Sequence, residues 1–290
     1  MDRYVQEPIP NVLEAKDYVF RSLRAPDEYH FYNKYVPQII STNELRQIYE
    51  LKNHVTPGSR VLTVSASGEQ PLFFKQYGAE YVLTFDISYN SYLLTSLKIA
   101  ALQTFTKRWD YEKFVRSLID HCKPQQLMST PGMDKVFRNL SDVQKNHISV
   151  MDRIGIPVFV DDIKCQIPYI GQDDYDKLRA SVKSPFPFIW TDITELDKKL
   201  GDEKFDFVYY SNILGFIHPH KVRQVMEKTK NYVNAGGKIF LVEDVHMDLI
   251  KSATDDVYKA PDWDVKILAP QCGSLINQFI IQRVQFTKQK

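Results

Sequence analysis

The stretch VLTVSASGEQPLFFKQYGAEYVLTFDIS, from Val61 to Ser88, contains two short apolar runs that each end in small or acidic residues. The first run is rich in β-formers and ends in Ser65-Ala66-Ser67-Gly68, whereas the second ends in Asp86. Between them, Pro71 can lie in the first turn of a short helix, and Gly78 can end it. A strand, a short helix and a second strand predict a parallel sheet.

Length and composition limit the class of protein. The 290 residues are enough to bury a sizeable core, and 37 Lys and Arg against 36 Asp and Glu give a net charge of +1. This balance does not favour nucleic acid as the main partner. The three cysteines show neither zinc nor disulfide spacing, and no apolar run is long enough to span a membrane, so we expect a cytoplasmic protein. The cysteines are Cys122, Cys165 and Cys272.

The order of apolar runs and breakers predicts an α/β fold: a Rossmann-like, mostly parallel sheet with a C-terminal antiparallel hairpin, N-terminal helices and a helical insertion. We infer the insertion because the next strand-like run, PFIWTDI, comes much later than one crossover requires. The predicted parts are an N-terminal helical layer (1–54), the Rossmann-like domain (55–108 and 186–290) and the helical insertion (109–185).

Ligands of an open parallel sheet collect at the carboxyl ends of its strands, so the residues just past each predicted strand are the candidate site. Asp86 lies 18 residues beyond Gly68, close to the spacing at which a carboxylate accepts both hydroxyls of an adenosine ribose. The candidate residues are Ser65, Ala66, Ser67, Gly68 and Glu69, then Asp86 and Ile87, Asp192 and Ile193, Ser211 and Asn212, and Glu243 and Asp244.

The first loop disfavours NAD and ATP, because it has a single glycine and no following Lys to hold a pyrophosphate. An adenosine without phosphate fits better, and S-adenosylmethionine is the predicted cofactor. Its ribose would lie on Asp86, its adenine near Asp192 and its amino-acid tail near the backbone of Ser65 to Gly68. The alternative is that both aspartates merely cap the helices that follow them.

The motifs SASGE, FDIS, FIWTDI, FDFVYYSNI and NAGGKIFLVED resemble those of class I S-adenosylmethionine-dependent transferases over roughly residues 55–245. More narrowly, DISYNSYLLTSLKIAALQ, DYEKF and YYSNI resemble the S-adenosylmethionine:diacylglycerol 3-amino-3-carboxypropyl transferases of betaine-lipid synthesis. The resemblance implies that Ser65, Ser67 and Gly68 lie under the methionine moiety and that Asp86 binds the ribose. It also places Asp192 and Ile193 at the adenine, and Ser211 and Asn212 facing the sulfonium.

An acceptor hydroxyl or amine must lose a proton, and Glu243, Asp244 and His246 after the fifth strand are the candidate bases. With Ser211 and Asn212 they form the predicted catalytic set, although Glu243 and Asp244 can equally be solvated loop carboxylates. We predict no metal, because His218 and His220 have no third ligand nearby in the sequence. Aromatic candidates for lining the sulfonium, each of which can instead be core, are Tyr209, Tyr210, Phe216 and the run Tyr29 to Tyr35.

Three hypotheses follow for function. The first is an enzyme that transfers the 3-amino-3-carboxypropyl group to a small-molecule or lipid acceptor, and the second is a methyltransferase. The third is a binding module that kept the fold and lost catalysis, which the glycine-poor loop motivates. A lipid acceptor would require peripheral membrane contact, for which KRWDYEKFVRSL offers Trp109, Phe114, Val115 and Leu118 among basic residues, unless that helix packs on the core.

Overall fold

The computed structural model describes the core of the chain and parts of its C-terminal region: residues 51–121, 125–154, 171–211, 213–214, 217–243, 251–252, 255–258, 263–268 and 277–283. Apart from residues 51–54, the predicted N-terminal helical layer lies outside the described residues. The three cysteines, Phe216 and the aromatic run Tyr29 to Tyr35 also lie outside them.

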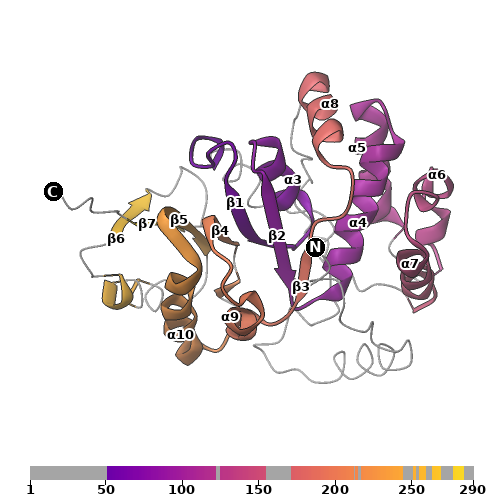
Figure 1. The fold of residues 1–290 in the computed structure, drawn as a ribbon. Helices are drawn as coiled ribbons and strands as arrows, with labels where there is room; N and C mark the ends of the chain where they lie inside the picture. Colours follow the sequence, from indigo (N-terminus) through magenta and orange to yellow (C-terminus); the bar gives the residue numbers. More distant parts are fainter. Residues whose placement is uncertain are drawn as a thin grey trace.

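Within the described part of the chain, a sheet has the strand order β3-β2-β1-β4-β5-β7-β6 (Figure 1). Strands β1 to β5 pair in parallel, whereas β7 runs antiparallel to both β5 and β6. This is the mostly parallel α/β sheet that the sequence predicts. The strands are β1 (Arg60–Val64), β2 (Tyr81–Asp86), β3 (Phe188–Trp190), β4 (Phe205–Ser211), β5 (Val233–Glu243), β6 (Trp263–Leu268) and β7 (Asn277–Arg283).

Helices cover both faces of the sheet, and alternate strand residues face the two layers. Along β4, for example, Phe207 and Tyr209 belong to one buried cluster, while Val208 and Tyr210 belong to the other. The described helices are η1 (Leu51–Asn53), α3 (Glu69–Gln76), α4 (Tyr89–Thr104), α5 (Arg108–Asp120), η2 (Leu127–Ser129), α6 (Met133–Phe137), α7 (Asp142–Ile154), α8 (Gln172–Ser181), η3 (Ile193–Glu195), α9 (Leu196–Leu200), α10 (Pro219–Thr229) and η5 (Lys230–Tyr232).

Helix α4 is buried over most of its circumference. The sequence predicts one apolar face through Leu94, Leu97 and Ala101, and these residues are at most 1% exposed. The opposite side is buried as well, because α5, α6 and α7 pack around the helix. In Figure 1 these helices gather beside α4, beyond the β2 and β3 edge of the sheet. Even Lys98, in the middle of α4, is fully buried.

The parallel register brings the carboxyl ends of four strands to one edge. Strand β1 pairs Val64 with Phe85 of β2, and β2 pairs Asp86 with Trp190 of β3. On its other side, β1 pairs Thr63 with Tyr209 of β4. The residues that follow these strands therefore lie close together, at the edge where such sheets bind ligands.

Candidate functional site at the carboxyl edge of the sheet

The loop after β1 makes a tight left-handed turn into α3. The Ser65 N–H donates to the Phe85 carbonyl at 2.7 Å, and the Gly68 N–H donates back to the Ser65 carbonyl at 2.8 Å. Ala66 has φ +44° and Gly68, the N-cap of α3, has φ +89°. A Cβ on Gly68 would lie 2.8 Å from Oγ1 of Thr95 on α4. Gly68 is therefore required both by its backbone conformation and by the close approach of α4.

Asp86 closes β2 and joins its end to the first loop. Its Oδ2 accepts from the Ala66 N–H at 2.9 Å and its Oδ1 accepts from the Ser88 N–H at 2.8 Å. The residue is only 8% exposed. Burial raises the pKa of Asp86 to about 6, while the hydrogen bonds from Ser88 and Ala66 act in the opposite direction. Hydrogen bonds from the Ser91 side chain and the Ile87 backbone also lower this pKa, so the carboxylate is held from both the first loop and the start of α4.

Glu69, the first residue of α3, is buried. Its side chain is 7% exposed and forms an ion pair with Lys98 of α4, beneath the loop. The sequence places Glu69 among the cofactor-binding residues, and this stays a prediction; in the structure Oε1 of Glu69 is bound by Lys98. The role of Lys98 is missed by the strand-end analysis, because Lys98 lies in the middle of a helix.

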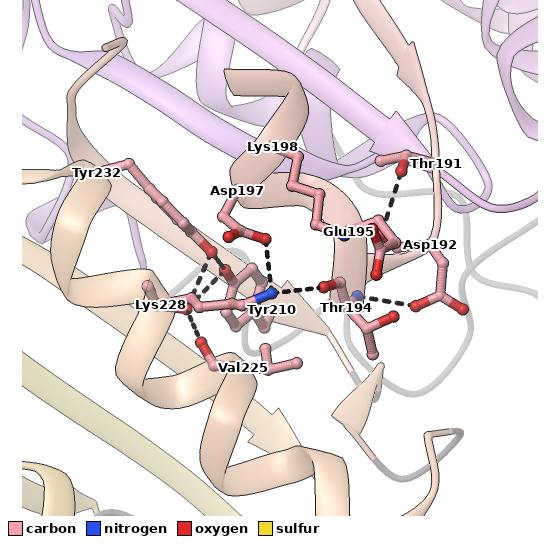
Figure 2. A network of polar contacts seen from close by, with 11 residues as sticks. Thr191, Asp192, Thr194, Glu195, Asp197, Lys198, Tyr210, Val225, Lys228 and Tyr232 are labelled. Atoms are coloured by element: carbon pink, nitrogen blue, oxygen red, sulfur yellow. Dashed lines mark hydrogen bonds and ion pairs between the residues drawn. The ribbon is translucent and has the colours of Figure 1, made fainter. Parts of the chain in front are cut away.

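At the end of β3, Asp192 caps the short helix that follows it, as Figure 2 shows. Its Oδ1 accepts from the Thr194 N–H at 2.8 Å. The same turn is tied to α10, because Lys228 Nζ donates to the Thr194 carbonyl at 3.0 Å and pairs with Asp197 at 2.9 Å. Asp192 is half-buried and Ile193 is 5% exposed. The capping alternative is therefore correct for one oxygen of Asp192, and the other oxygen is available to a ligand.

Strands β2 and β3 meet closely beside Asp86. The Thr191 N–H donates to the Asp86 carbonyl at 3.0 Å, and Trp190 Nε1 donates to the Ile87 carbonyl at 2.8 Å. Ile87 is 36% exposed, and the half-buried Trp190 packs against Tyr89 with ring centroids 5.7 Å apart. The Tyr89 and Trp190 rings meet edge to face, at an interplanar angle of 61°, and with Ile87 they place apolar side chains beside Asp86. The position of Trp190, two residues before Asp192, is the signal in the sequence that could have identified it.

The predicted catalytic residues are only partly described. Ser211 ends β4 as a half-buried residue, and the register places it at the same edge as Ser65. Strand β5 ends at Glu243, whose backbone alone is described. Asn212, Asp244 and His246 lie outside the described residues. The catalytic set therefore stays a prediction.

Two neighbouring tyrosines on β4 are core residues. Tyr209 is fully buried and packs against Phe74 and Phe240. Tyr210, on the opposite face, bonds through its hydroxyl to Thr229 and Tyr232 of the helical layer (Figure 2). Burial raises the pKa of Tyr210 well above its usual value. The core alternative holds for both residues, so neither ring lines the open edge.

His218 and His220 lie at the start of α10 with their Nδ1 atoms 2.6 Å apart. Both residues are exposed. Within the described ranges, no group of three or more His, Cys, Asp or Glu side chains could hold a metal ion.

The basic helix considered for membrane contact packs on the core. Phe114, Val115 and Leu118 of α5 are at most 1% exposed, and Trp109 alone of the four apolar residues is exposed, at 68%. The alternative that this helix packs on the core is therefore correct for three of the four apolar residues, because the neighbouring helix α4 covers them. No helix in the described part of the chain is long and apolar enough to cross a membrane.

The strand order is that of a Rossmann-like, mostly parallel sheet, in which an antiparallel β7 lies between β5 and β6. No family model matches the chain, and no curated protein matches it. Solved structures similar to it include a protein from Streptococcus mutans named as a SAM-dependent methyltransferase (TM-score 0.45, 9% identity, 84% of this chain and 49% of that chain). Another is the ribosomal protein L11 methylase from Lactobacillus delbrueckii subsp. bulgaricus (TM-score 0.43, 12% identity, 86% of this chain and 82% of that chain).

A third similar structure is the N-methyltransferase NodS from Bradyrhizobium japonicum (TM-score 0.41, 8% identity, 83% of this chain and 95% of that chain). The chain spans about half the length of the Streptococcus mutans protein and of a second methyltransferase solved with SAH, at 49% and 50%. Likenesses at these TM-scores assign no function to the chain.

Proposed function

We propose that the chain is a group transferase that uses S-adenosylmethionine. The observation that carries the proposal is the hydrogen bond from the Ala66 N–H to Asp86 Oδ2, at 2.9 Å. It joins the loop predicted for the methionine moiety to the carboxylate predicted for the ribose, next to the point between β1 and β4 where the strand order reverses. In open α/β sheets this switch point is where ligands bind.

In this arrangement the ribose diol donates to the Asp86 carboxylate, and the adenine lies over Ile87 and Trp190 towards Asp192. S-adenosylmethionine supplies an activated carbon next to a sulfonium, whose positive charge is lost as the bond to sulfur breaks. The protein therefore has to orient the donor against an acceptor rather than stabilise a strong anion. Ser211, at the end of β4, lies at the edge where the reacting carbon would be.

Calorimetry with S-adenosylmethionine and S-adenosylhomocysteine tests cofactor use. Binding of either compound supports the proposal, and a large loss of affinity in Asp86→Ala assigns the ribose site. Absence of binding to both compounds contradicts the proposal and favours the binding module.

Two transfers are candidates for the reaction itself. The sequence motifs favour the 3-amino-3-carboxypropyl group, whereas the similar solved structures are named as methyltransferases. The nucleoside product separates them, because aminocarboxypropyl transfer releases methylthioadenosine and methyl transfer releases S-adenosylhomocysteine. Mass spectrometry of the product after incubation with cell extract makes this distinction without a known acceptor.

The predicted acceptor is a small molecule or a lipid. Some of the similar solved structures are named as an rRNA methylase and as a ribosomal protein methylase, so the extract should be fractionated into small-molecule, lipid, RNA and protein pools. The pool that sustains product formation identifies the class of acceptor. Product formation with RNA alone would contradict the predicted acceptor.

A further inference from the structure

A buried lysine lies directly beneath the loop that follows β1. Lys98, in the middle of α4, has a side chain that is 0% exposed. Its Nζ donates to Oε1 of Glu69, at the start of α3, and to the carbonyl oxygen of Ser67 in the loop. The ammonium group of Lys98 thus connects α4 to the loop after β1 and to the first turn of α3.

Stability alone does not explain this ion pair. Removing two charges from water is costly, and replacing a buried ion pair by apolar residues of similar volume is often neutral or stabilising. Glu69 Oε2 is moreover buried without a hydrogen-bond partner, so the pair is not fully satisfied. Its geometric effect is more specific, since it fixes both a backbone carbonyl and the residue that begins α3.

The loop needs external support because of its backbone conformation. Ala66 adopts a positive φ of +44°, which residues with a Cβ rarely do, and Gly68 is the only glycine in the turn. Each part of the loop has a contact from outside it. Asp86 accepts from the Ala66 N–H, Thr95 Oγ1 lies 3.1 Å from Ser65 Oγ, and Lys98 holds Ser67 and Glu69.

Two of the residues that contact the loop, Thr95 and Lys98, belong to α4, the helix that follows Asp86 in the sequence. Helix α4 begins at Tyr89, three residues after Asp86, and Ser88 is its N-cap. Thr95 and Lys98 are three residues apart and so lie on the same side of the helix. Helix α4 therefore fixes the loop after β1 relative to the end of β2.

We propose that Lys98 is a positioning residue, which holds the loop of residues 65–69 in the conformation that receives the amino-acid end of the cofactor. The ligand in this inference rests on the proposed function, whereas the effect on the loop does not. Lys98 lies beneath the loop and acts through Ser67 and Glu69.

Two variants test whether Lys98 positions the loop or only neutralises the buried charge of Glu69. Lys98→Met leaves the buried Glu69 without its partner, which lowers stability in either case. The double variant Lys98→Met with Glu69→Gln removes both charges. We expect it to recover most of the lost stability, while the Ser67 carbonyl still lacks its donor. Lys75→Met is the control, because Lys75 Nζ also donates to two carbonyls, those of Ala79 and Glu80, away from the site.

Hydrogen–deuterium exchange of the ligand-free protein tests the loop directly. In the double variant we expect the amides of residues 65–70 to exchange at least tenfold faster than in the unmodified protein, with α10 unchanged. Calorimetry should then show at least a tenfold weaker affinity for S-adenosylhomocysteine. Lys75→Met should alter neither measurement.

The outcomes distinguish the two proposals. Unchanged loop exchange and unchanged affinity in the double variant would overturn the positioning role, even if Lys98→Met is destabilised. If the unmodified protein binds no cofactor but the loop exchange still depends on Lys98, the proposed function fails and the positioning of the loop stands. Faster loop exchange with unchanged affinity would show that the ligand does not need the ordered loop, which contradicts the inference.

Discussion

The loops after β1 and β3 contain two ends of the candidate site, and they are held in different ways. The first loop depends on residues far away in the sequence, since Asp86, Thr95 and Lys98 are 20 to 31 residues from their partners. The loop after β3 has a local cap, since Asp192 accepts from the N–H of Thr194 two positions later, and it is also tied to Lys228 of α10, 34 residues from Thr194. The loop proposed for the methionine end is therefore held by residues distant in the sequence, whereas the turn proposed for the adenine end has a local cap in addition to its long-range contact.

The largest expected loss of affinity follows from removing the Asp86 carboxylate, which accepts from the loop after β1 and, in our proposal, from the ribose. Asp86→Ala should weaken binding of S-adenosylhomocysteine by about 100-fold or more, because hydrogen bonds to a charged group contribute about 1.5–3 kcal/mol each. Calorimetry measures the change.

Asp206→Ala is a matched control for this variant. Asp206 accepts from the Arg60 N–H at 2.8 Å and from Asn234 at 2.7 Å, at the opposite edge of the sheet. It should lower stability and leave the affinity of the folded protein unchanged. Equal losses of affinity in the two variants would mean that Asp86 acts only through the fold.

The next effect concerns the close approach of the first loop to α4. Gly68→Ala combines a positive φ with a Cβ 2.8 Å from Thr95 Oγ1, whereas Gly58 has a similar φ of +84° and open space around its Cβ position. Gly58→Ala should lower the free energy of unfolding by about 1 kcal/mol through the backbone alone. Gly68→Ala should lower it by about 2 kcal/mol more, because of overpacking. Denaturant unfolding measures both free energies. Equal losses in the two variants would show that α4 can shift to accommodate the added Cβ at little cost.

The pH dependence of S-adenosylhomocysteine binding tests the proposed contact between the Asp86 carboxylate and the ribose. Burial raises the pKa of Asp86 to about 6 in the free protein, and the ribose hydroxyls donate to its ionised form. Binding should therefore lower this pKa, so affinity should rise as the pH increases through about 6 and level off above it. Between pH 5 and pH 7.5 we expect a gain of about tenfold. Calorimetry of Asp86→Asn should give a flat profile over this range, and a slope that persists there would assign the titration to another group.

The smallest effect is expected at the locally capped end. Asp192→Ala should lower the free energy of unfolding by about 1 kcal/mol through the lost cap. It should weaken S-adenosylhomocysteine binding by about fivefold, the value of one ordinary hydrogen bond. Thermal unfolding and calorimetry measure the two losses separately. An affinity loss as large as that of Asp86→Ala would remove the distinction between the two ends.

The sequence predicts the parts of the structure that depend on local pattern. Strands β1 and β2 follow from two short apolar runs rich in β-formers, the intervening helix follows from Pro71 and Gly78, and Asp86 follows from its place at the end of the second run. Asp192 illustrates the limit, since a strand-end carboxylate can cap a helix and still bind a ligand.

The features that the sequence does not predict depend on contacts between distant segments. Lys98 is a charged residue on the predicted apolar face of its helix, four residues after Leu94 and three before Ala101, and its buried partner Glu69 lies 29 residues away in the sequence. Trp190 faces Ile87 only because β3 pairs with β2 across the whole predicted insertion. Local propensity does not contain such long-range choices.

The placement of Trp190 gives the protein an intrinsic optical reporter. Its indole donates to the Ile87 carbonyl beside the proposed purine surface, while the two other tryptophans lie on β6, at the far edge of the sheet, and on the exposed face of α5. A purine stacked near Trp190 would change its fluorescence and leave the emission of Trp109 and Trp263 as a constant background. Occupancy could then be followed in real time without a label, and Trp190→Phe would identify the source of the signal.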